Sequence, residues 1–397
     1  MKRFTILAIL LLVSVNLIFS YDAGLLLDQK IEGENQLFTY TPGLVPWLSW
    51  DSGKGASLYL SGIVSLKYSK SDDDISENDG WGKPVLLPEL SRFSFSYRAG
   101  QRHAIELGRM YYSDVLGVTA LGLFDGLRYE GTLPQGTFNA GVYYTGLLYK
   151  ETAKVIMTGS DAMSYGDPRQ LDKFGDYFAS RRVLGAVRWD MPLMEIHNFS
   201  VEALAQFDLN GEDDALHSQY GELQFEFFTQ NRLGITVGAF VEALESDGEF
   251  GLAFGALASV RIDLPTALND GLKLTGKFCS GSWNDTLVLY TPLSAINQGE
   301  VFPEIFSGLW SIKGNYEVRI LRSLFAEASV AYYGRSYSED DGGYFYGGEL
   351  WASIGWQPVD DIRVYLGGGL FFPGMGNAYP SGTDTMWKIS GGLSLSF

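Results

Sequence analysis

Cysteine, histidine and long apolar runs are scarce in this sequence, and each scarcity excludes a class of protein. The single thiol, Cys279, cannot form a disulfide within the chain. The three histidines show no spacing typical of a zinc site, and we expect neither a bound metal nor a cofactor. No apolar run reaches the roughly 20 residues that a membrane-spanning helix needs. The sequence therefore fits neither a disulfide-stabilised scaffold nor a helical membrane protein.

The longest apolar run lies at the N-terminus and is typical of a secretory signal peptide. Lys2 and Arg3 precede an apolar run over residues 4–13, and the small residue Ser20 follows a second, shorter apolar stretch. We therefore predict a signal peptide over residues 1–20 and a single exported domain over residues 21–397.

Charge and composition narrow the class further. The net charge is −18, and since nucleic-acid binding depends on Lys and Arg contacts to phosphates, we expect no nucleic-acid partner. The 48 glycines among 397 residues exceed the average usage of about 7%, and aromatic residues reach 14%. In an exported chain without long apolar helices, this composition favours an all-β barrel.

Apolar and polar side chains alternate from residue 56 onward, in segments of about ten to thirteen residues. One such segment carries Phe199, Val201, Ala203, Ala205 and Phe207 on one face and Ser200, Glu202, Gln206 and Asp208 on the other. The segments at 232–242 and 312–320 repeat the pattern. A period of two is that of a β-strand with one apolar and one polar face.

The connections between these segments alternate between short and long. The short ones fall at 99–100, 132–136, 191–197, 229–231, 321–322 and 357–360, and the long ones at 69–88, 149–180, 210–217, 282–308 and 373–384. Outer-membrane barrels have short periplasmic turns and longer external loops, whereas a soluble sandwich has no reason to sort its loops by length. The sequence therefore predicts a transmembrane, antiparallel, up-and-down β-barrel.

The number of strands depends on the N-terminal residues of the mature chain. Sixteen alternating segments lie between residue 56 and the C-terminus. Residues 21–50 contain two more alternating stretches, and Pro42 and Pro46 interrupt the second. Prolines are tolerated at edge-like or bulged positions of a sheet. We predict eighteen strands, with sixteen as the alternative if residues 21–50 form a short inward segment.

The C-terminal segment resembles the assembly signal of bacterial outer-membrane barrels. The matching residues are Ser390, Gly392, Leu395 and Phe397. Aromatic residues also occupy the outward position at the periplasmic ends of strands, as in the girdles of such barrels: Tyr97, Tyr129, Trp189, Phe227, Trp356 and Phe397. The resemblance, which over the body of the chain is to porin-like barrels in general, implies the cell outer membrane, contact with its lipid and recognition by the barrel assembly machinery.

Charged residues on the inward face of the predicted strands are the candidate functional residues, because lumen charges tune the selectivity of porins. The basic members are Arg92, Arg98, Arg182, Arg188, Arg232, Lys273, Lys277, Arg319, Arg363 and Lys388. The acidic members are Glu202, Glu222, Glu226, Glu242, Glu317, Glu327 and Glu349. Segments 149–180 and 282–308 are long enough to fold inward, and the second is unusually apolar for a loop exposed to water.

These features favour a porin-like channel for passive diffusion of small hydrophilic solutes, narrowed by inward-folded loops and without enzymatic activity. One alternative is a non-conducting structural or adhesive barrel, because acidic runs crowd the external loops at 72–79 and 339–341. Another is an outer-membrane hydrolase with a rim active site around His217, which follows three acidic residues at 212–214. The sequence leaves the oligomeric state open, including a homo-oligomer.

Overall fold

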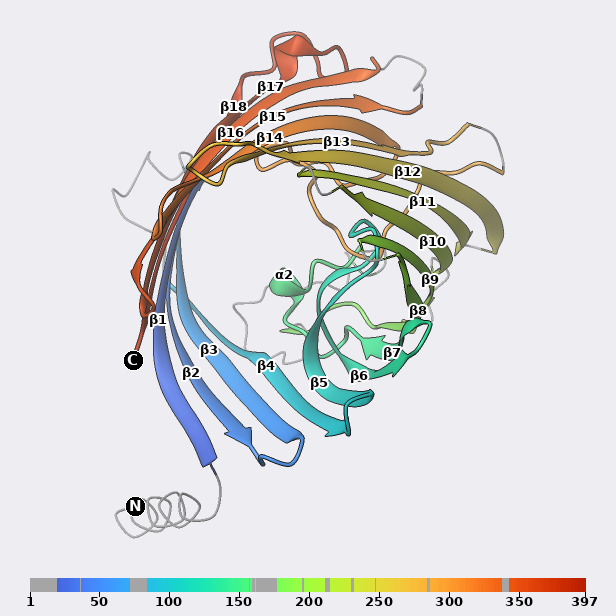
Figure 1. Cartoon of the computed structure of the whole chain (residues 1–397). Coiled ribbons are helices and arrows are strands. Elements are labelled where there is room, and N and C mark those ends of the chain that lie inside the picture. Colours follow the sequence, from blue (N-terminus) through green and yellow to red (C-terminus); the bar gives the residue numbers. More distant parts are fainter. Residues whose placement is uncertain are drawn as a thin grey trace.

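The chain folds into one closed β-barrel (Figure 1). The computed structural model describes residues 20–35, 37–71, 84–156, 158, 161, 177–194, 196–210, 215–229, 232–246, 248–283, 286–337 and 343–397. Of the predicted signal peptide, only Ser20 belongs to these residues, where it begins the first strand. Among the described residues, no helix has the length and apolar content to cross a membrane.

Eighteen strands form the barrel. They are β1 (Ser20–Glu34), β2 (Leu37–Asp51), β3 (Ala56–Ser71), β4 (Val85–Ala99), β5 (His103–Ser113), β6 (Leu121–Leu133), β7 (Gly136–Tyr144), β8 (Arg182–Leu193), β9 (His197–Asp208), β10 (Leu216–Phe228), β11 (Leu233–Ser246), β12 (Glu249–Asp263), β13 (Gly271–Cys279), β14 (Leu309–Leu321), β15 (Leu324–Arg335), β16 (Phe345–Val359), β17 (Ile362–Phe372) and β18 (Met386–Ser396). Two short helical turns, α2 (Lys150–Ala153) and η3 (Pro373–Met375), complete the described elements.

Each strand pairs antiparallel with its neighbours in sequence, and β1 closes the ring by pairing with β18. Leu25 and Phe397 exchange both backbone hydrogen bonds, at 3.1 and 2.9 Å. Both ends of the barrel chain therefore lie on the same rim, as an even number of strands requires. The prediction of eighteen strands is confirmed, and residues 21–50 are two wall strands rather than an inward segment.

The two prolines of β2 interrupt its pairing on one side only. Towards β1 the register is continuous through Pro42 and Pro46, whereas towards β3 it skips both prolines and their preceding residues. Proline has no backbone N–H to donate. The barrel tolerates these gaps because the register on either side of each gap is unchanged.

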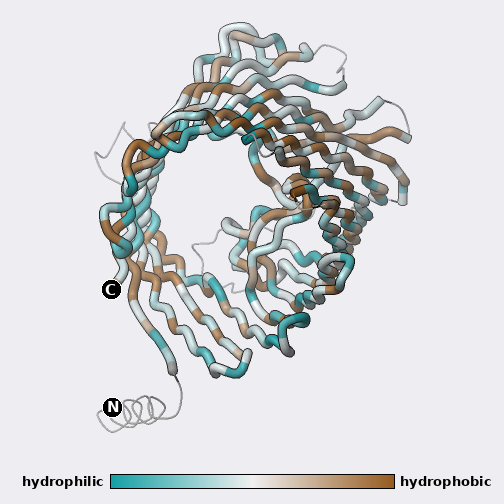
Figure 2. Tube along the Cα trace, in the orientation of Figure 1, coloured by the Kyte–Doolittle hydropathy of each residue, from teal (hydrophilic) through white to brown (hydrophobic). Residues whose placement is uncertain are grey.

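Hydrophobic and hydrophilic residues alternate along the strands (Figure 2). The large apolar side chains that remain exposed, such as Val142, Val187, Val241 and Leu366, belong to the outward face. The buried core instead lies inside the barrel, between the wall and inward-folded segments. Tyr290, Phe302 and Phe306 of the β13–β14 loop are fully buried there, so the predicted inward folding of segment 282–308 is confirmed.

The β5–β6 hairpin also enters the lumen, which the sequence analysis did not predict. Figure 1 shows the external part of this hairpin inside the ring of strands, near α2. Gly108 and Gly126 face each other across the hairpin, and Gly108 has a φ of 128°. A Cβ atom would lie 2.1 Å from the Phe93 carbonyl oxygen at Gly108 and 2.3 Å from the Val142 oxygen at Gly126. Only glycine fits at these two positions.

Candidate functional site

The tip of the β5–β6 hairpin, residues 114–120, lies inside the lumen and is held by Glu202 of β9. The Tyr112 hydroxyl and the Val115 backbone N–H each donate to the Glu202 carboxylate at 2.6 Å. Within the tip, the Asp114 carboxylate accepts four backbone N–H groups at 2.7 to 3.2 Å. Each bond to a charged acceptor contributes about 1.5–3 kcal/mol. The tip is therefore a hydrogen-bonded turn fixed to the inner wall at β9.

Thr119 connects the hairpin tip to two further elements. Its hydroxyl donates to the carboxylate of Glu222 on β10 and lies 2.8 Å from the hydroxyl of Tyr290 in the β13–β14 loop. Because Tyr290 is completely buried, its pKa is raised well above the ordinary value of about 10. The hairpin and the β13–β14 loop are further joined inside the barrel by the backbone N–H of Ser294, which donates to the Thr119 carbonyl oxygen at 3.1 Å.

The β13–β14 loop, residues 280–308, is anchored to the wall by two glutamates. The backbone N–H of Thr291 donates to Glu242 at 2.8 Å. Glu349 accepts the N–H groups of three consecutive residues, 300 to 302, at 2.7 to 3.0 Å. Phe302 stacks on Tyr333 with ring centroids 4.1 Å apart. The loop is therefore part of the barrel interior and not a flexible external arm.

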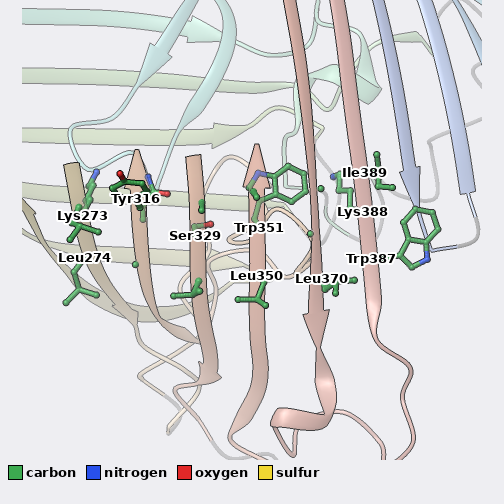
Figure 3. A pocket seen from close by; sticks show the side chains of 18 of the residues that line it. Lys273, Leu274, Tyr316, Ser329, Leu350, Trp351, Leu370, Trp387, Lys388 and Ile389 are labelled. Carbon is green, nitrogen blue, oxygen red and sulfur yellow. The ribbon is translucent and has the colours of Figure 1, made fainter. Parts of the chain in front are cut away.

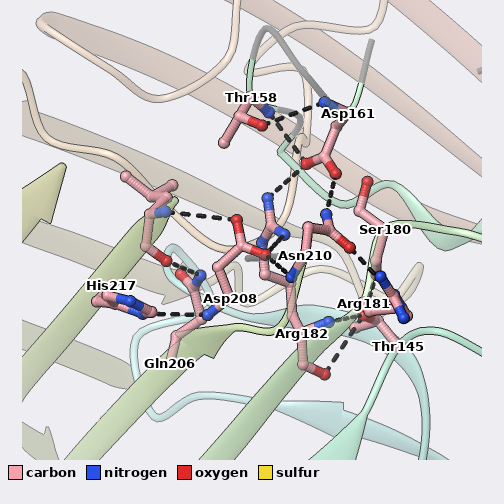
Figure 4. A network of polar contacts seen from close by, with 11 residues as sticks. Thr145, Thr158, Asp161, Ser180, Arg181, Arg182, Gln206, Asp208, Asn210 and His217 are labelled. Atoms are coloured by element: carbon pink, nitrogen blue, oxygen red, sulfur yellow. Dashed lines mark hydrogen bonds and ion pairs between the residues drawn. The ribbon is translucent and has the colours of Figure 1, made fainter. Parts of the chain in front are cut away.

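Arg182 of β8 anchors the β7–β8 loop, residues 145–181 (Figure 4). Its guanidinium lies 2.5 Å from Asp161 of that loop and 2.6 Å from Asp208 of β9, and only 1% of the arginine side chain is exposed. His217 stands beside this network, where its Nδ1 accepts the backbone N–H of Asp208 at 3.2 Å. The histidine that the sequence offered as a catalytic candidate is thus engaged in holding a strand end.

The structure divides the predicted lumen charges into two groups. Five are buried beneath the hairpin tip and the loops: Arg182, Glu202, Glu222, Glu242 and Glu349. The others are partly or fully exposed: Arg92, Arg98, Arg188, Arg232, Lys273, Lys277, Arg319, Arg363, Lys388, Glu226, Glu317 and Glu327. Burial therefore removes four of the seven predicted glutamates from solvent but only one of the ten predicted basic residues. Arg232 precedes β11 in a turn rather than lying on the strand.

Two adjoining polar recesses of about 340 and 240 Å³ follow the inner wall from β2 to β9, and both are lined by Arg128. The larger contains Arg92 and Arg98. Arg128 pairs with Glu106 at 2.5 Å, and Arg188 pairs with Asp190 at 2.8 Å. Four further charged residues of the recesses, Arg128, Glu106, Asp190 and Glu130, were not among the predicted lumen charges, although their strand parity places them on the inner face.

A group of lysines faces the lumen from β13 and β14. Lys313 lies directly opposite Thr275, so that Lys273 and Lys277 flank it two residues away on either side. The ammonium group of Lys277 donates to Gln298 of the inward loop at 3.1 Å. With the arginines of the recesses, basic side chains therefore line the lumen on two separate sectors of the wall.

A cavity of about 1190 Å³ lies outside the barrel. It is an apolar groove over β12 to β18, where Leu274, Leu350 and Leu370 stand on neighbouring strands (Figure 3). Small residues form its floor, because Ala328, Ala352 and Gly368 lie in one outward-facing row. The lining is mainly apolar, so this groove is poorly suited to orient a hydrophilic solute.

No group of three or more His, Cys, Asp or Glu side chains is arranged to hold a metal ion within the described residues. The acidic runs at 72–79, 212–214 and 339–341 fall outside those residues. Their contribution to an adhesive surface or a rim active site stays a prediction.

No family model and no curated protein matches this chain, but solved barrels of Pseudomonas aeruginosa resemble it. OccK5 (OpdH) is 10% identical, with 95% of this chain and 98% of that chain covered at a TM-score of 0.63. OpdK, crystallised with vanillate, is 11% identical over 95% and 98% at 0.63. OprD is 9% identical over 95% and 95% at 0.57. At these identities, the likeness shows a shared barrel fold.

Proposed function

We propose that this barrel is an outer-membrane channel for the passive diffusion of small hydrophilic solutes, with a preference for anions. The observation that carries the proposal is the sorting of lumen charge. The glutamates that hold the inward segments are buried. The basic side chains Arg92, Arg98, Lys273, Lys277 and Lys313 stay in contact with solvent. An accessible lumen of mainly positive charge raises the local concentration of anions.

The fold supports the same conclusion. Closed barrels of 16 to 18 strands leave an aqueous channel unless it is filled, and the barrels of the same fold include OpdK, whose crystal structure holds vanillate, a small carboxylate. Anchored segments narrow the lumen without a separate plug domain in the described chain. Transport then requires no chemical step, and we infer that the protein is not an enzyme.

A double substitution tests the selectivity. In a planar bilayer with a salt gradient, Arg92→Glu with Arg98→Glu should move the reversal potential towards cation preference, because four units of charge change in one lumen recess. A matched control, Lys54→Glu with Arg102→Glu, makes the same change in periplasmic turns and should shift the reversal potential much less. Equal shifts, or none, would remove the recess from the permeation path.

The runner-up is a structural or adhesive barrel that conducts nothing. The acidic external runs favour it, and deletion of those runs should then abolish surface binding while the barrel remains. A conducting wild-type protein would leave adhesion as at most a second activity of the external loops.

A further inference from the structure

The wall of the barrel is interrupted between β4 and β5. β4 pairs with β3 from Val85 to Tyr97, but with β5 only from Phe93 to Ala99. Beyond Arg109, β5 continues to pair with β6 as the hairpin bends inward. Among the described residues, the external half of β4 therefore has no neighbouring strand on that side.

A segment of the β7–β8 loop closes this interruption. We define the strap as residues 147–153 together with Tyr177. The Tyr177 hydroxyl donates to the Pro88 carbonyl oxygen at 2.6 Å, and the Thr152 hydroxyl donates to the Glu89 carboxylate at 2.8 Å. Burial and the neighbouring Glu89 raise the pKa of Tyr177 to about 12. Within the described residues, side chains of the strap and not a backbone ladder attach it to β4.

Arg109 connects all parts of this junction. Its guanidinium forms two bonds to Asp125 of β6, at 2.8 and 2.9 Å, and donates to the Leu147 carbonyl of the strap at 2.8 Å. It also donates to the Leu90 carbonyl of β4. Only 4% of the arginine side chain is exposed. By strand parity, Arg109 and Asp125 belong to the outward face, where a charged pair facing lipid is unfavourable. The inward bend of the hairpin instead places the pair inside the junction.

We propose that the external half of the β4–β5 junction is a lateral gate between the lumen and the membrane, held shut by the strap and by Arg109. The proposal rests on the proposed function in requiring that the barrel span a membrane. Within the described residues, side-chain hydrogen bonds close this part of the wall, whereas backbone pairing from Val85 to Tyr97 joins β4 to β3 on its other side. Local opening favours the parts of a structure with the fewest such bonds. The gate can therefore open without disturbing the pairing of β4 with β3.

A spin label at the edge of the gate tests the proposal. In a Cys279→Ser background, a label on Leu90→Cys reports contact with lipid or with a water-soluble nickel chelate in bilayers. The double substitution Thr152→Val with Tyr177→Phe should raise chelate contact at position 90 severalfold, because water from the lumen reaches the open edge. Arg109→Met should raise it further if that variant folds.

The control label is Leu60→Cys, an outward residue of β3 that pairs on both sides with Leu48 and Phe93. Its contact with lipid should not change. Unchanged contact at position 90 in the strap variant would overturn the proposal. A rise at both positions would overturn it as well, because the whole wall would then be loosened. Neither spin-label measurement depends on conductance. The gate proposal and the channel proposal can therefore be contradicted separately.

Discussion

The hydroxyl of Tyr112 on β5 donates to the carboxylate of Glu202 on β9 at 2.6 Å, and this contact inside the barrel joins strands that lie four places apart in the eighteen-stranded ring. The bond joins strands that are not neighbours in the sheet. The bond fixes the inward hairpin, which narrows the channel. Strand parity predicted Glu202 to be a pore-lining charge, whereas the structure shows that it holds the hairpin.

Glu202→Ala should release the hairpin tip. The substitution removes two bonds to a charged acceptor, each of about 1.5–3 kcal/mol, while the wall strands keep their pairing. We expect a higher and noisier single-channel conductance than in the wild type. Glu226→Ala is the control, because Glu226 is partly exposed and, within the described part of the chain, accepts a hydrogen bond from Asn198 of the neighbouring wall strand and from no inward segment. If Glu202→Ala conducts with wild-type amplitude and noise, the hairpin does not narrow the channel.

Tyr290 should resist ionisation in the folded protein. Its raised pKa means that the folded state favours the neutral phenol, so its contribution to stability is complete below pH of about 10 and is lost as the pH rises above that value. The phenolate absorbance of the wild type minus that of Tyr290→Phe should stay flat through this range. A difference that titrates near the ordinary value would place the β13–β14 loop in solvent.

Arg182→Met should detach the β7–β8 loop from the wall. It leaves Asp161 and Asp208 buried without their counter-charge, a loss of about 3–5 kcal/mol. We expect faster proteolysis within residues 145–181 and an intact barrel band on gels. Arg188→Met should have little effect, because its pair with Asp190 is 30% exposed on both sides. Equal cleavage of the two variants would contradict the anchoring role of Arg182.

Deletion of Phe397 should impair closure of the barrel. The residue exchanges two backbone hydrogen bonds with Leu25 and ends the predicted assembly signal. The folded yield in micelles measures the effect of the lost hydrogen bonds. The folded yield in cells measures the effect of the altered assembly signal. We expect a severalfold lower folded yield in cells, restored by Phe397→Tyr. Wild-type yield after the deletion would leave the assembly signal without support.

The alternation along the strands, the order of short and long connections and the number of strands were all predictable. Alternate residues of a wall strand face opposite sides of the sheet, and their polarity differs accordingly. The same parity placed Glu202, Glu242 and Glu349 on the inner face. It could not show that loops cover them, since the donors are backbone N–H groups up to 87 residues distant in the chain. The sequence of a wall strand alone therefore does not show whether a loop covers one of its residues.

The inward hairpin was missed for a related reason. Its tip at 114–120 belongs to neither the short nor the long connections that the sequence predicted. Two signals were present: a facing pair of glycines, Gly108 and Gly126, and an apolar tip sequence over residues 115–121. Strand parity also placed Arg109 and Asp125 on the lipid side, because parity holds only while the strand remains in the wall.

Single-channel recording of the purified, folded wild-type protein in a planar bilayer tests the central claim most directly. An anchored hairpin and loops that narrow but do not fill the lumen predict discrete conductance steps, with a reversal potential in a salt gradient on the anion side. A preparation shown to be folded that gives no steps would contradict the channel, and the inward segments would then be a plug.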